Sequence, residues 1–455
     1  MLFEKIISEG LAHNSYLIGD GNEAVVIDPR RDVDIYLEKT WSQGVTIKHV
    51  LETHRNEDYL VGSLAIKKQT GASIWHADSQ LDYQYGKPVQ DGQQIEVGRL
   101  KIEAIHTPGH TPQSYSYILY GYEGQPWMVF TGDALLAGYV RRVGFLFEDN
   151  IDELASKLYD SIFNKILPLG DGVILCPAHG AGSVCGGQIK DRNLTTVGIE
   201  KNLNPKLQVQ NKDDFIAEVG QVMEKAPYFK TMEKENVKGP SPLTECCFPE
   251  ALSADEFLTE VEKDDTVVID TRMESDFAAA HIQDSISIWK QGLASFAGWF
   301  LPYEKDILIV SEGNDVTDEV KLLRRMGYDN IRGYLSGGML KWHMAGNKSE
   351  SINTVTVDKL CNILDSNTEK ITILDVRSQE EIRENGEIAD SINIHITQLP
   401  HNLARVPENQ EVYIFCGSGL RSMIAASILK RADYNNINVV LGGLSGWSST
   451  TCPIK

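Results

Sequence analysis

The feature that most constrains this chain is an internal repeat in its C-terminal half. Asp270 in the sequence VVIDTR corresponds to Asp375 in TILDVR, and Trp342 in GGMLKW corresponds to Trp447 in GGLSGW. Both pairs are 105 residues apart. A period that is kept at both ends of a segment indicates one structural unit repeated in tandem. We therefore predict two copies of one domain, at residues 246–350 (the first copy) and 351–455 (the second copy).

The length of the chain leaves room for one more domain. At about 150 residues per domain, 455 residues predict about three domains. Residues 1 to about 225 mix strand-like and helix-like runs, which predicts an α/β core for a first domain at residues 1–245. Between Ala226 and Leu252 the hydrophobic periodicity fails and proline accumulates, so we expect a linker at the end of this domain. The predicted strands are Ala24–Ile27, Lys48–Leu51, Met128–Thr131 and Val173–Cys176, and the predicted helices are Leu60–Gln69 and Ile151–Phe163.

Charge and composition argue against several classes of protein. The formal net charge is −21, and so acidic a chain would be repelled by the phosphates of nucleic acids. The first residues lack the apolar core of a signal peptide, and no apolar run approaches the length of a membrane span. Seven cysteines without regular spacing do not form a disulfide framework in a chain of this size. We expect a protein of the reducing cytoplasm that binds neither nucleic acid nor membrane.

One cysteine occupies a position that activates thiols. The β-branched and aromatic run Val412–Phe415 predicts a buried strand, and Met423–Lys430 has the spacing and composition of a helix. Cys416 therefore lies at a strand-to-helix turn, where backbone amides and the helix N-terminus favour a thiolate and any anion that it carries. Arg421 adds a positive charge. The amides expected to bind the substrate belong to Gly417, Ser418, Gly419 and Leu420.

The loop from Cys416 to Arg421 (the Cys416 loop) resembles the active loop of rhodaneses, sulfurtransferases that carry a cysteine persulfide. The sequences ILDVR and GGLSGW of the same copy match the opening and closing motifs of that family. The resemblance implies an α/β domain with a parallel sheet for each copy. It also implies that Cys416 carries sulfur and that Arg421 stabilises its charge. In the first copy the corresponding position is Ser311, within SEGNDV. A hydroxyl is a poor sulfur carrier and two acids would repel an anionic persulfide, so we expect an inactive copy.

Polar residues also follow four apolar runs of the N-terminal domain. His54 lies in THRNEDY, His110 in TPGHTP, Asp133 in FTGDA and His179 in PAHGAGS. Polar side chains at the ends of neighbouring strands can converge on one site. Four such loops in this order predict a metal site.

These loops resemble the metallo-β-lactamase superfamily over residues 1 to about 225, which implies an αββα sandwich. The first loop of that family has the pattern Thr-His-x-His-x-Asp-His, and Asn56 and Tyr59 replace its second and third histidines here. Members with two metals use the last histidine together with the residues that match Asp58 and His179. The resemblance therefore disfavours a second metal.

Within the same superfamily, persulfide dioxygenases hold a single iron through the residues that match His54, His110 and Asp133. Two histidines and one carboxylate with open positions suit a non-haem Fe(II) oxygenase, because a thiolate substrate and O₂ must both reach the metal. The resemblance implies one Fe(II) per chain, or Zn if the site is altered.

The same resemblance implies roles for the residues around the metal. The segment that follows FTGDA keeps Arg142 of the group's pattern and loses two of its acids, and such changes alter metal affinity or activity. Cys185 follows His179 on a glycine-rich loop and would be either a second sulfur acceptor near the metal or an ordinary loop cysteine. Arg142 and Tyr59 would bind substrate, while the groups expected to hydrogen-bond to the ligands or the substrate are Asn56, Asp58 and His179.

The whole chain is similar to proteins that fuse a persulfide dioxygenase to rhodanese domains. We expect it to oxidise low-molecular-weight, glutathione-like persulfides with O₂ to sulfite or thiosulfate, and to transfer sulfane sulfur through Cys416. One alternative is a sulfur carrier whose metal domain has lost its chemistry, as Asn56 and Tyr59 would favour. Another is a glyoxalase II-like thioester hydrolase, which would need two metals. The sequence is compatible with a homo-oligomer of this chain.

Overall fold

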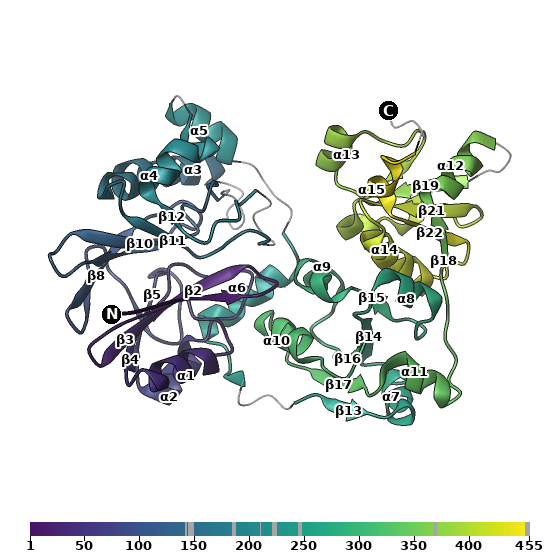
Figure 1. Cartoon of the computed structure of the whole chain (residues 1–455), viewed down its shortest axis with the longest axis horizontal. Helices are drawn as coiled ribbons and strands as arrows, with labels where there is room; N and C mark the ends of the chain where they lie inside the picture. The colour runs from purple at the N-terminus through teal and green to yellow at the C-terminus, as the bar shows by residue number, and fades with distance from the viewer. Residues whose placement is uncertain are drawn as a thin grey trace. The chain divides into compact units, whose positions relative to one another are not determined.

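The computed structural model describes residues 1–141, 143, 150–183, 188–209, 211–220, 225–243, 248–366 and 371–450. Two of the predicted site residues, Arg142 and Cys185, lie outside this described part. The chain divides into two compact units, Met1–Cys247 with Lys321–Asp329, and Phe248–Val320 with Asn330–Lys455 (Figure 1). Among the described helices, none combines the length and apolarity needed to cross a bilayer.

The first unit contains two mixed six-stranded sheets. Their strand orders are β1-β2-β3-β4-β5-β6 and β12-β11-β10-β9-β8-β7. The strands of the first sheet are β1 (Leu2–Ser8), β2 (His13–Asp20), β3 (Glu23–Ile27), β4 (Thr46–Leu51), β5 (Ser73–His76) and β6 (Lys87–Pro88). The strands of the second are β7 (Gln94–Val97), β8 (Leu100–His106), β9 (Tyr115–Tyr120), β10 (Pro126–Gly132), β11 (Ile174–Pro177) and β12 (Thr195–Thr196).

Successive side chains along a strand of the second sheet point alternately to its inner face, between the two sheets, and to its outer face. Tyr117 and Leu119 pack between the sheets with Ile18 and Val25, whereas Ile118 packs on the outer face. Figure 1 shows α3 (Ile151–Ser161), α4 (Val197–Leu203) and α5 (Lys212–Val219) on this outer face, and α1 (Asp34–Ser42) and α2 (Ser63–Thr70) against the first sheet. The predicted αββα sandwich is thereby confirmed.

The segment predicted to be a linker contains a packed helix. Helix α6 (Tyr228–Lys238) buries Phe229, Met232 and Asn236 and belongs to the first unit. The linker prediction is wrong for this stretch because prolines flank the helix rather than interrupt it. Residues near the end of the N-terminal domain therefore contribute to its core.

The two copies in the second half form five-stranded sheets of one topology, β13-β17-β16-β14-β15 and β18-β22-β21-β19-β20. All of their strand pairings are parallel, as predicted. The first copy has β13 (Glu250–Leu252), α7 (Ala254–Val261), β14 (Thr266–Asp270), α8 (Glu274–Ala279), β15 (Ile286–Ser287), α9 (Leu293–Phe300), β16 (Asp306–Val310), α10 (Thr317–Arg325), β17 (Ile331–Leu335) and α11 (Gly338–Met344). The second has β18 (Asn353–Thr356), α12 (Val357–Ser366), β19 (Ile371–Asp375), α13 (Gln379–Asn385), β20 (Ile392–Asn393), β21 (Glu411–Phe415), α14 (Leu420–Arg431), β22 (Ile437–Leu441) and α15 (Gly443–Trp447).

Helix α14 of the second copy packs against the first copy. Phe277 and Ala278 of α8 share one buried cluster with Met423 and Ile424 of α14. The first copy therefore buries part of the surface of the helix that follows Cys416.

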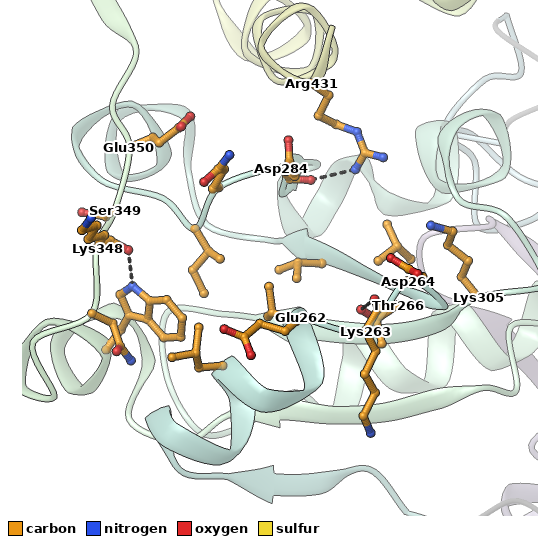
Figure 2. A pocket seen from close by; sticks show the side chains of 18 of the residues that line it. Glu262, Lys263, Asp264, Thr266, Asp284, Lys305, Lys348, Ser349, Glu350 and Arg431 are labelled. Carbon is orange, nitrogen blue, oxygen red and sulfur yellow. Dashed lines mark hydrogen bonds between the residues drawn. The ribbon is translucent and has the colours of Figure 1, made fainter. Parts of the chain in front are cut away.

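A cavity of about 940 Å³ lies within the second unit (Figure 2). The first copy supplies most of its lining, and Arg431 of α14 closes one side by donating a hydrogen bond to the Asp284 carbonyl at 2.7 Å. Its charged lining carries both signs, as Glu262 and Lys263 illustrate. The cavity contains none of the predicted site residues, so it is separate from both candidate sites.

Candidate functional site

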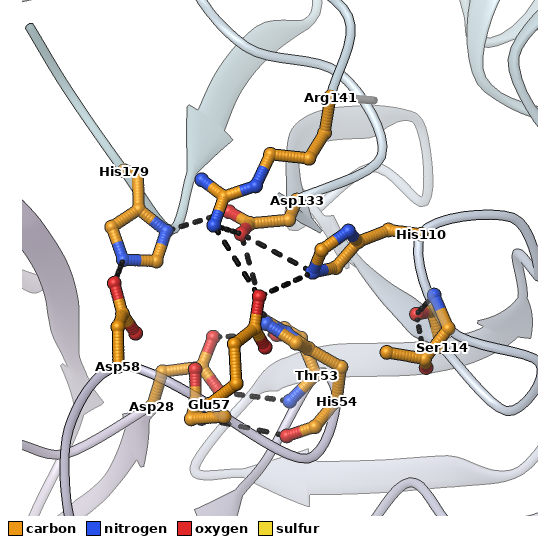
Figure 3. A network of polar contacts seen from close by, with 12 residues as sticks. Asp28, Thr53, His54, Glu57, Asp58, His110, Ser114, Asp133, Arg141 and His179 are labelled. Atoms are coloured by element: carbon orange, nitrogen blue, oxygen red, sulfur yellow. Dashed lines mark hydrogen bonds and ion pairs between the residues drawn. The ribbon is translucent and has the colours of Figure 1, made fainter. Parts of the chain in front are cut away.

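The three predicted metal ligands come together in the first unit. His54 follows β4, His110 follows β8 and Asp133 follows β10, and all three are buried. One ligand atom from each lies within 4.8 Å of the other two. The Asp133 Oδ2 atom is 3.8 Å from His54 Nε2 and 3.7 Å from His110 Nε2 (Figure 3). The spacing suits one cation bound by two imidazoles and a carboxylate.

A buried chain of hydrogen bonds orients His54. The Thr53 hydroxyl donates to Asp28 Oδ2 at 2.8 Å, and its oxygen, Thr53 Oγ1, lies 2.8 Å from His54 Nδ1. The single hydroxyl proton is used by Asp28, so Nδ1 carries the imidazole proton and Nε2 keeps a lone pair. Burial lowers the pKa of His54 to about 4, which keeps the ring neutral at pH 7.

The His54 Nε2 atom is the structural test of whether these residues fit a metal. It is buried, and no hydrogen-bond partner for it exists among the described residues. A buried nitrogen with a lone pair, close to a second imidazole and a carboxylate, is the donor that a metal ion would satisfy. The residues therefore fit a single metal ion.

Gly132, the glycine of FTGDA, is required because its backbone passes close to the side chain of Thr53. Gly132 has φ +53°, and a Cβ there would lie 2.7 Å from Thr53 Oγ1. Only glycine tolerates both the backbone conformation and this contact. It lets the loop that carries Asp133 pass directly against Thr53.

His179, which matches a second-metal ligand of the family, lies between two carboxylates. His179 Nδ1 lies 2.7 Å from Asp133 Oδ1, and its Nε2 lies 2.9 Å from Asp58 Oδ2. Burial opposes a charge on His179, but Asp133 and then Asp58 outweigh it and raise its pKa to about 10. Tyr59, where the family pattern has a histidine, packs against His13 with ring centroids 3.9 Å apart and ring planes inclined by 32°.

Two charged residues that sequence reasoning missed complete the cluster. Glu57 Oε1 lies 3.1 Å from His110 Nε2, and Arg141 Nη2 lies 3.1 Å from Asp133 Oδ2 and 3.5 Å from Glu57 Oε1. Both are almost fully buried. Arg141 is the neighbour of the arginine that the family pattern highlighted. The available signal was a pair of arginines within the apolar segment GYVRRV.

A third missed residue, Asn236 of α6, secures the loop after His54. Its side chain accepts a hydrogen bond from Val61 N at 3.0 Å and donates to the carbonyls of Asn56 at 2.9 Å and Tyr59 at 2.8 Å. The Asn56 side chain instead donates weakly, at 3.4 Å, to the His54 carbonyl. Asn236 escaped notice because its segment was predicted to be a linker.

The second candidate site is the Cys416 loop. Cys416 lies between β21 and α14, as predicted, and is fully buried. The backbone amide of Gly419 donates to Cys416 Sγ at 3.1 Å. An amide that points at the sulfur stabilises a thiolate.

The closing motif GGLSGW holds the carbonyls of this loop. The amides of Leu444, Ser445 and Gly442 donate to the carbonyls of Cys416, Gly417 and Ser418 at 2.9, 3.0 and 3.0 Å, respectively. Gly443 has φ +45°, and a Cβ there would lie 2.2 Å from the Cys416 carbonyl oxygen. With its carbonyls fixed in this way, the loop can present its amides to the sulfur.

Arg421 is held by an acid that sequence reasoning missed. Its Nη1 and Nη2 atoms donate to Glu381 Oε2 at 2.7 Å and Oε1 at 2.5 Å. Glu381 is fixed in turn, because it forms a capping box with Ser378 at the start of α13. The positive charge that was predicted beside Cys416 is therefore positioned by a second helix.

The first copy has a carboxylate at the corresponding site. The Ser311 hydroxyl donates to Glu319 Oε1 at 3.1 Å, and Lys290 lies 3.3 Å from Glu319 Oε2. Glu319 is almost fully buried and was not among the acids singled out from the sequence. The site carries a hydroxyl and a paired acid in place of a thiol.

Comparison with known proteins adds independent information. The family model for rhodanese-like domains matches residues 253–345 and 356–450, and that for the metallo-beta-lactamase superfamily matches residues 9–179. Human mitochondrial persulfide dioxygenase ETHE1 is 29% identical over 213 residues, which cover 45% of this chain and 75% of the relative. Hydroxyacylglutathione hydrolase GloC of Haemophilus influenzae is 26% identical over 214 residues, which cover 42% and 91%. A crystal structure of a metallo-beta-lactamase from Staphylococcus aureus subsp. aureus COL is 28% identical with a TM-score of 0.64, covering 74% of this chain and 98% of that one.

Proposed function

Because this chain belongs to the metallo-β-lactamase superfamily and continues into two rhodanese-like domains, we propose that it oxidises small persulfides with O₂ and transfers their sulfane sulfur through Cys416. The proposal assigns oxidation to residues 1–245 and sulfur transfer to residues 351–455, with residues 246–350 inactive. The likeness to persulfide dioxygenase ETHE1 supports the oxidation, and the second rhodanese-like match supports the transfer.

The observation that carries the proposal is the convergence of His54, His110 and Asp133 on one point. An iron ion held by these residues would supply open positions for a thiolate and O₂. The chain's own contribution is orientation: Asp28 and Thr53 fix His54, and burial of the cluster keeps bulk water away.

Sulfur transfer in the second rhodanese-like domain needs no external oxidant. The Cys416 thiolate attacks the outer sulfur of a small persulfide, so a new S–S bond forms and the small thiolate leaves. Sulfite from the oxidation then attacks the outer sulfur of the Cys416 persulfide. Thiosulfate leaves, and the electron pair of the broken bond returns to Cys416 Sγ, beside the Gly419 amide.

Two other functions are weaker candidates. A thioester hydrolase, as the likeness to GloC would suggest, needs a second metal, and Tyr59 stands where the family pattern has a histidine ligand of that metal. A sulfur carrier with an inert metal domain is favoured by one observation, the Arg141 guanidinium 3.1 Å from Asp133 Oδ2.

Metal analysis of anaerobically purified protein, combined with oxygen uptake on glutathione persulfide, tests the proposal. We expect about one iron per chain and uptake that is lost in His110→Ala. Iron-free protein, or uptake that is indifferent to this substitution, would leave the carrier function. Intact mass after incubation with thiosulfate should show one added sulfur that Cys416→Ser abolishes, and persistence of the adduct would refute the role of Cys416.

A further inference from the structure

The guanidinium of Arg141 occupies a position in the metal-ligand cluster that no recognised motif predicts. We propose that Arg141 is a built-in cation of the metal centre, which shares the metal-facing oxygen of Asp133 and thereby weakens metal binding. The inference rests on the metal of the proposed function but concerns a different property, the affinity of the centre. Arg141 acts here as a positioning and charge-balancing residue.

The geometry places Arg141 in direct competition with a metal. Arg141 Nη2 lies 3.1 Å from Asp133 Oδ2, nearer than His110 Nε2 at 3.7 Å and His54 Nε2 at 3.8 Å. Figure 3 shows the guanidinium directed between the carboxylates of Asp133 and Glu57. A divalent ion bound by the same oxygen would lie close to this positive charge.

The inward position of Arg141 is built into the loop. Val140 and Val143 on either side of it are anchored in the hydrophobic cluster under α3 and α5. Earlier in the loop, Gly138 N donates to the fully buried Glu200 at 2.7 Å. Fixing the loop on both sides keeps the intervening guanidinium inside the protein.

The charge of Arg141 has two consequences. An arginine remains protonated at all accessible pH values, so its repulsion of a metal ion cannot be relieved by losing a proton. Its removal would leave the buried Asp133 and Glu57 carboxylates without their permanent positive partner, and such carboxylates attract a cation strongly. Metal affinity should therefore rise when the charge is removed.

The experiment measures binding of Zn²⁺, and of Fe²⁺ under anaerobic conditions, by the full-length protein in competition with a chromophoric chelator. Arg141→Met and Arg141→Gln remove the charge, and the glutamine variant keeps hydrogen-bonding capacity should the methionine variant unfold. We expect about 10–100-fold tighter binding in both, the range over which residues next to metal ligands tune affinity. Arg141→Lys keeps the charge and should bind as the wild type does.

Arg99→Met is the matched control, because it removes an ion pair with Asp20 in the same domain but away from the cluster. A second readout is the shift in unfolding temperature between chelator-treated and Zn²⁺-loaded protein, which should be larger in the uncharged variants. Uncharged variants that bind metal as weakly as the wild type, or not at all, would overturn the inference. If the wild type binds no metal and the Arg141→Gln variant does, the inference is supported and the proposed function is refuted.

Discussion

Arg421 and Glu381 form a two-point ion pair beside the Cys416 loop, with donor–acceptor distances of 2.7 and 2.5 Å. The same carboxylate caps α13 through Ser378. One acid therefore joins α14, the helix that follows the Cys416 loop, to α13, the helix that follows the opening motif.

This pair predicts a pH dependence of stability. Burial would raise the pKa of Glu381, but the hydrogen bonds from Arg421 and Ser378 outweigh it and lower the pKa from 4.5 to about 2. A lowered carboxyl pKa contributes stability above pH 4.5 that is lost as pH falls towards 2. Because the pair is partly exposed, we expect only about 1–2 kcal/mol. Urea midpoints of the intact chain at pH 6 and 3 should differ less in Glu381→Gln than in the wild type, whereas the exposed Glu384→Gln should behave as the wild type.

Gly443→Ala should impair sulfur loading of Cys416. The new Cβ would lie 2.2 Å from the Cys416 carbonyl oxygen, so the loop must shift and move its amides off the sulfur. We expect at least a roughly 10-fold slower gain of one sulfur from thiosulfate, followed by intact mass. Gly338→Ala is the matched control, because Gly338 has the same place beside Ser311 in the first copy. Equal loading rates in the two variants would contradict the predicted role of the glycine.

Thr53→Val should weaken metal binding through His54. The substitution keeps the shape of the side chain but removes the hydroxyl that links Asp28 to His54 Nδ1. Without this link the ring is no longer held with Nε2 towards the cluster, and Zn²⁺ affinity should fall by about 10–100-fold. Thr53→Ser keeps the hydroxyl and should retain affinity. Unchanged affinity in Thr53→Val would show that the hydrogen-bond chain does not orient the ligand.

Asn236→Ala should destabilise the first unit. The substitution leaves Val61 N and the carbonyls of Asn56 and Tyr59 without this partner, at a cost of about 2–4 kcal/mol. Urea unfolding followed by fluorescence should show the loss, and amide exchange should increase at Val61. Asn202→Ala removes an exposed side-chain contact within α4 and should change stability by less than about 0.5 kcal/mol.

Local patterns explain what was predictable from the sequence. The run Val412–Phe415 predicted β21 nearly to its ends, because strand composition and a following small-residue loop are local signals. The His54, His110 and Asp133 loops were recognisable because each has a distinctive short sequence after an apolar run. The repeat predicted two sheets of one topology before any strand was assigned.

The residues that escaped prediction act through contacts that no local pattern encodes. Arg141 and Glu57 pair across 84 positions in the chain, and Glu381 meets Arg421 across 40. Asn236 lies on a short amphipathic helix between prolines, and these flanking helix-breaking residues hid the helical periodicity of the segment. These charged residues are paired by the folded structure and not by their spacing in the chain. The sequence therefore indicates His54, His110 and Asp133 but not the charged residues Glu57 and Arg141 beside them.

The Asn236 contact has a consequence for how the protein is made. The loop after His54 is secured by a side chain 180 positions later in the chain than Asn56. During synthesis the N-terminal residues leave the ribosome first, and the loop beside the His–His–Asp cluster lacks its fastening until α6 has emerged. A nascent or truncated chain that ends at residue 179, where the superfamily match ends, would contain all three cluster residues but would lack the Asn236 hydrogen bonds to the loop after His54. We therefore expect the cluster to assemble only once the whole N-terminal domain has been synthesised.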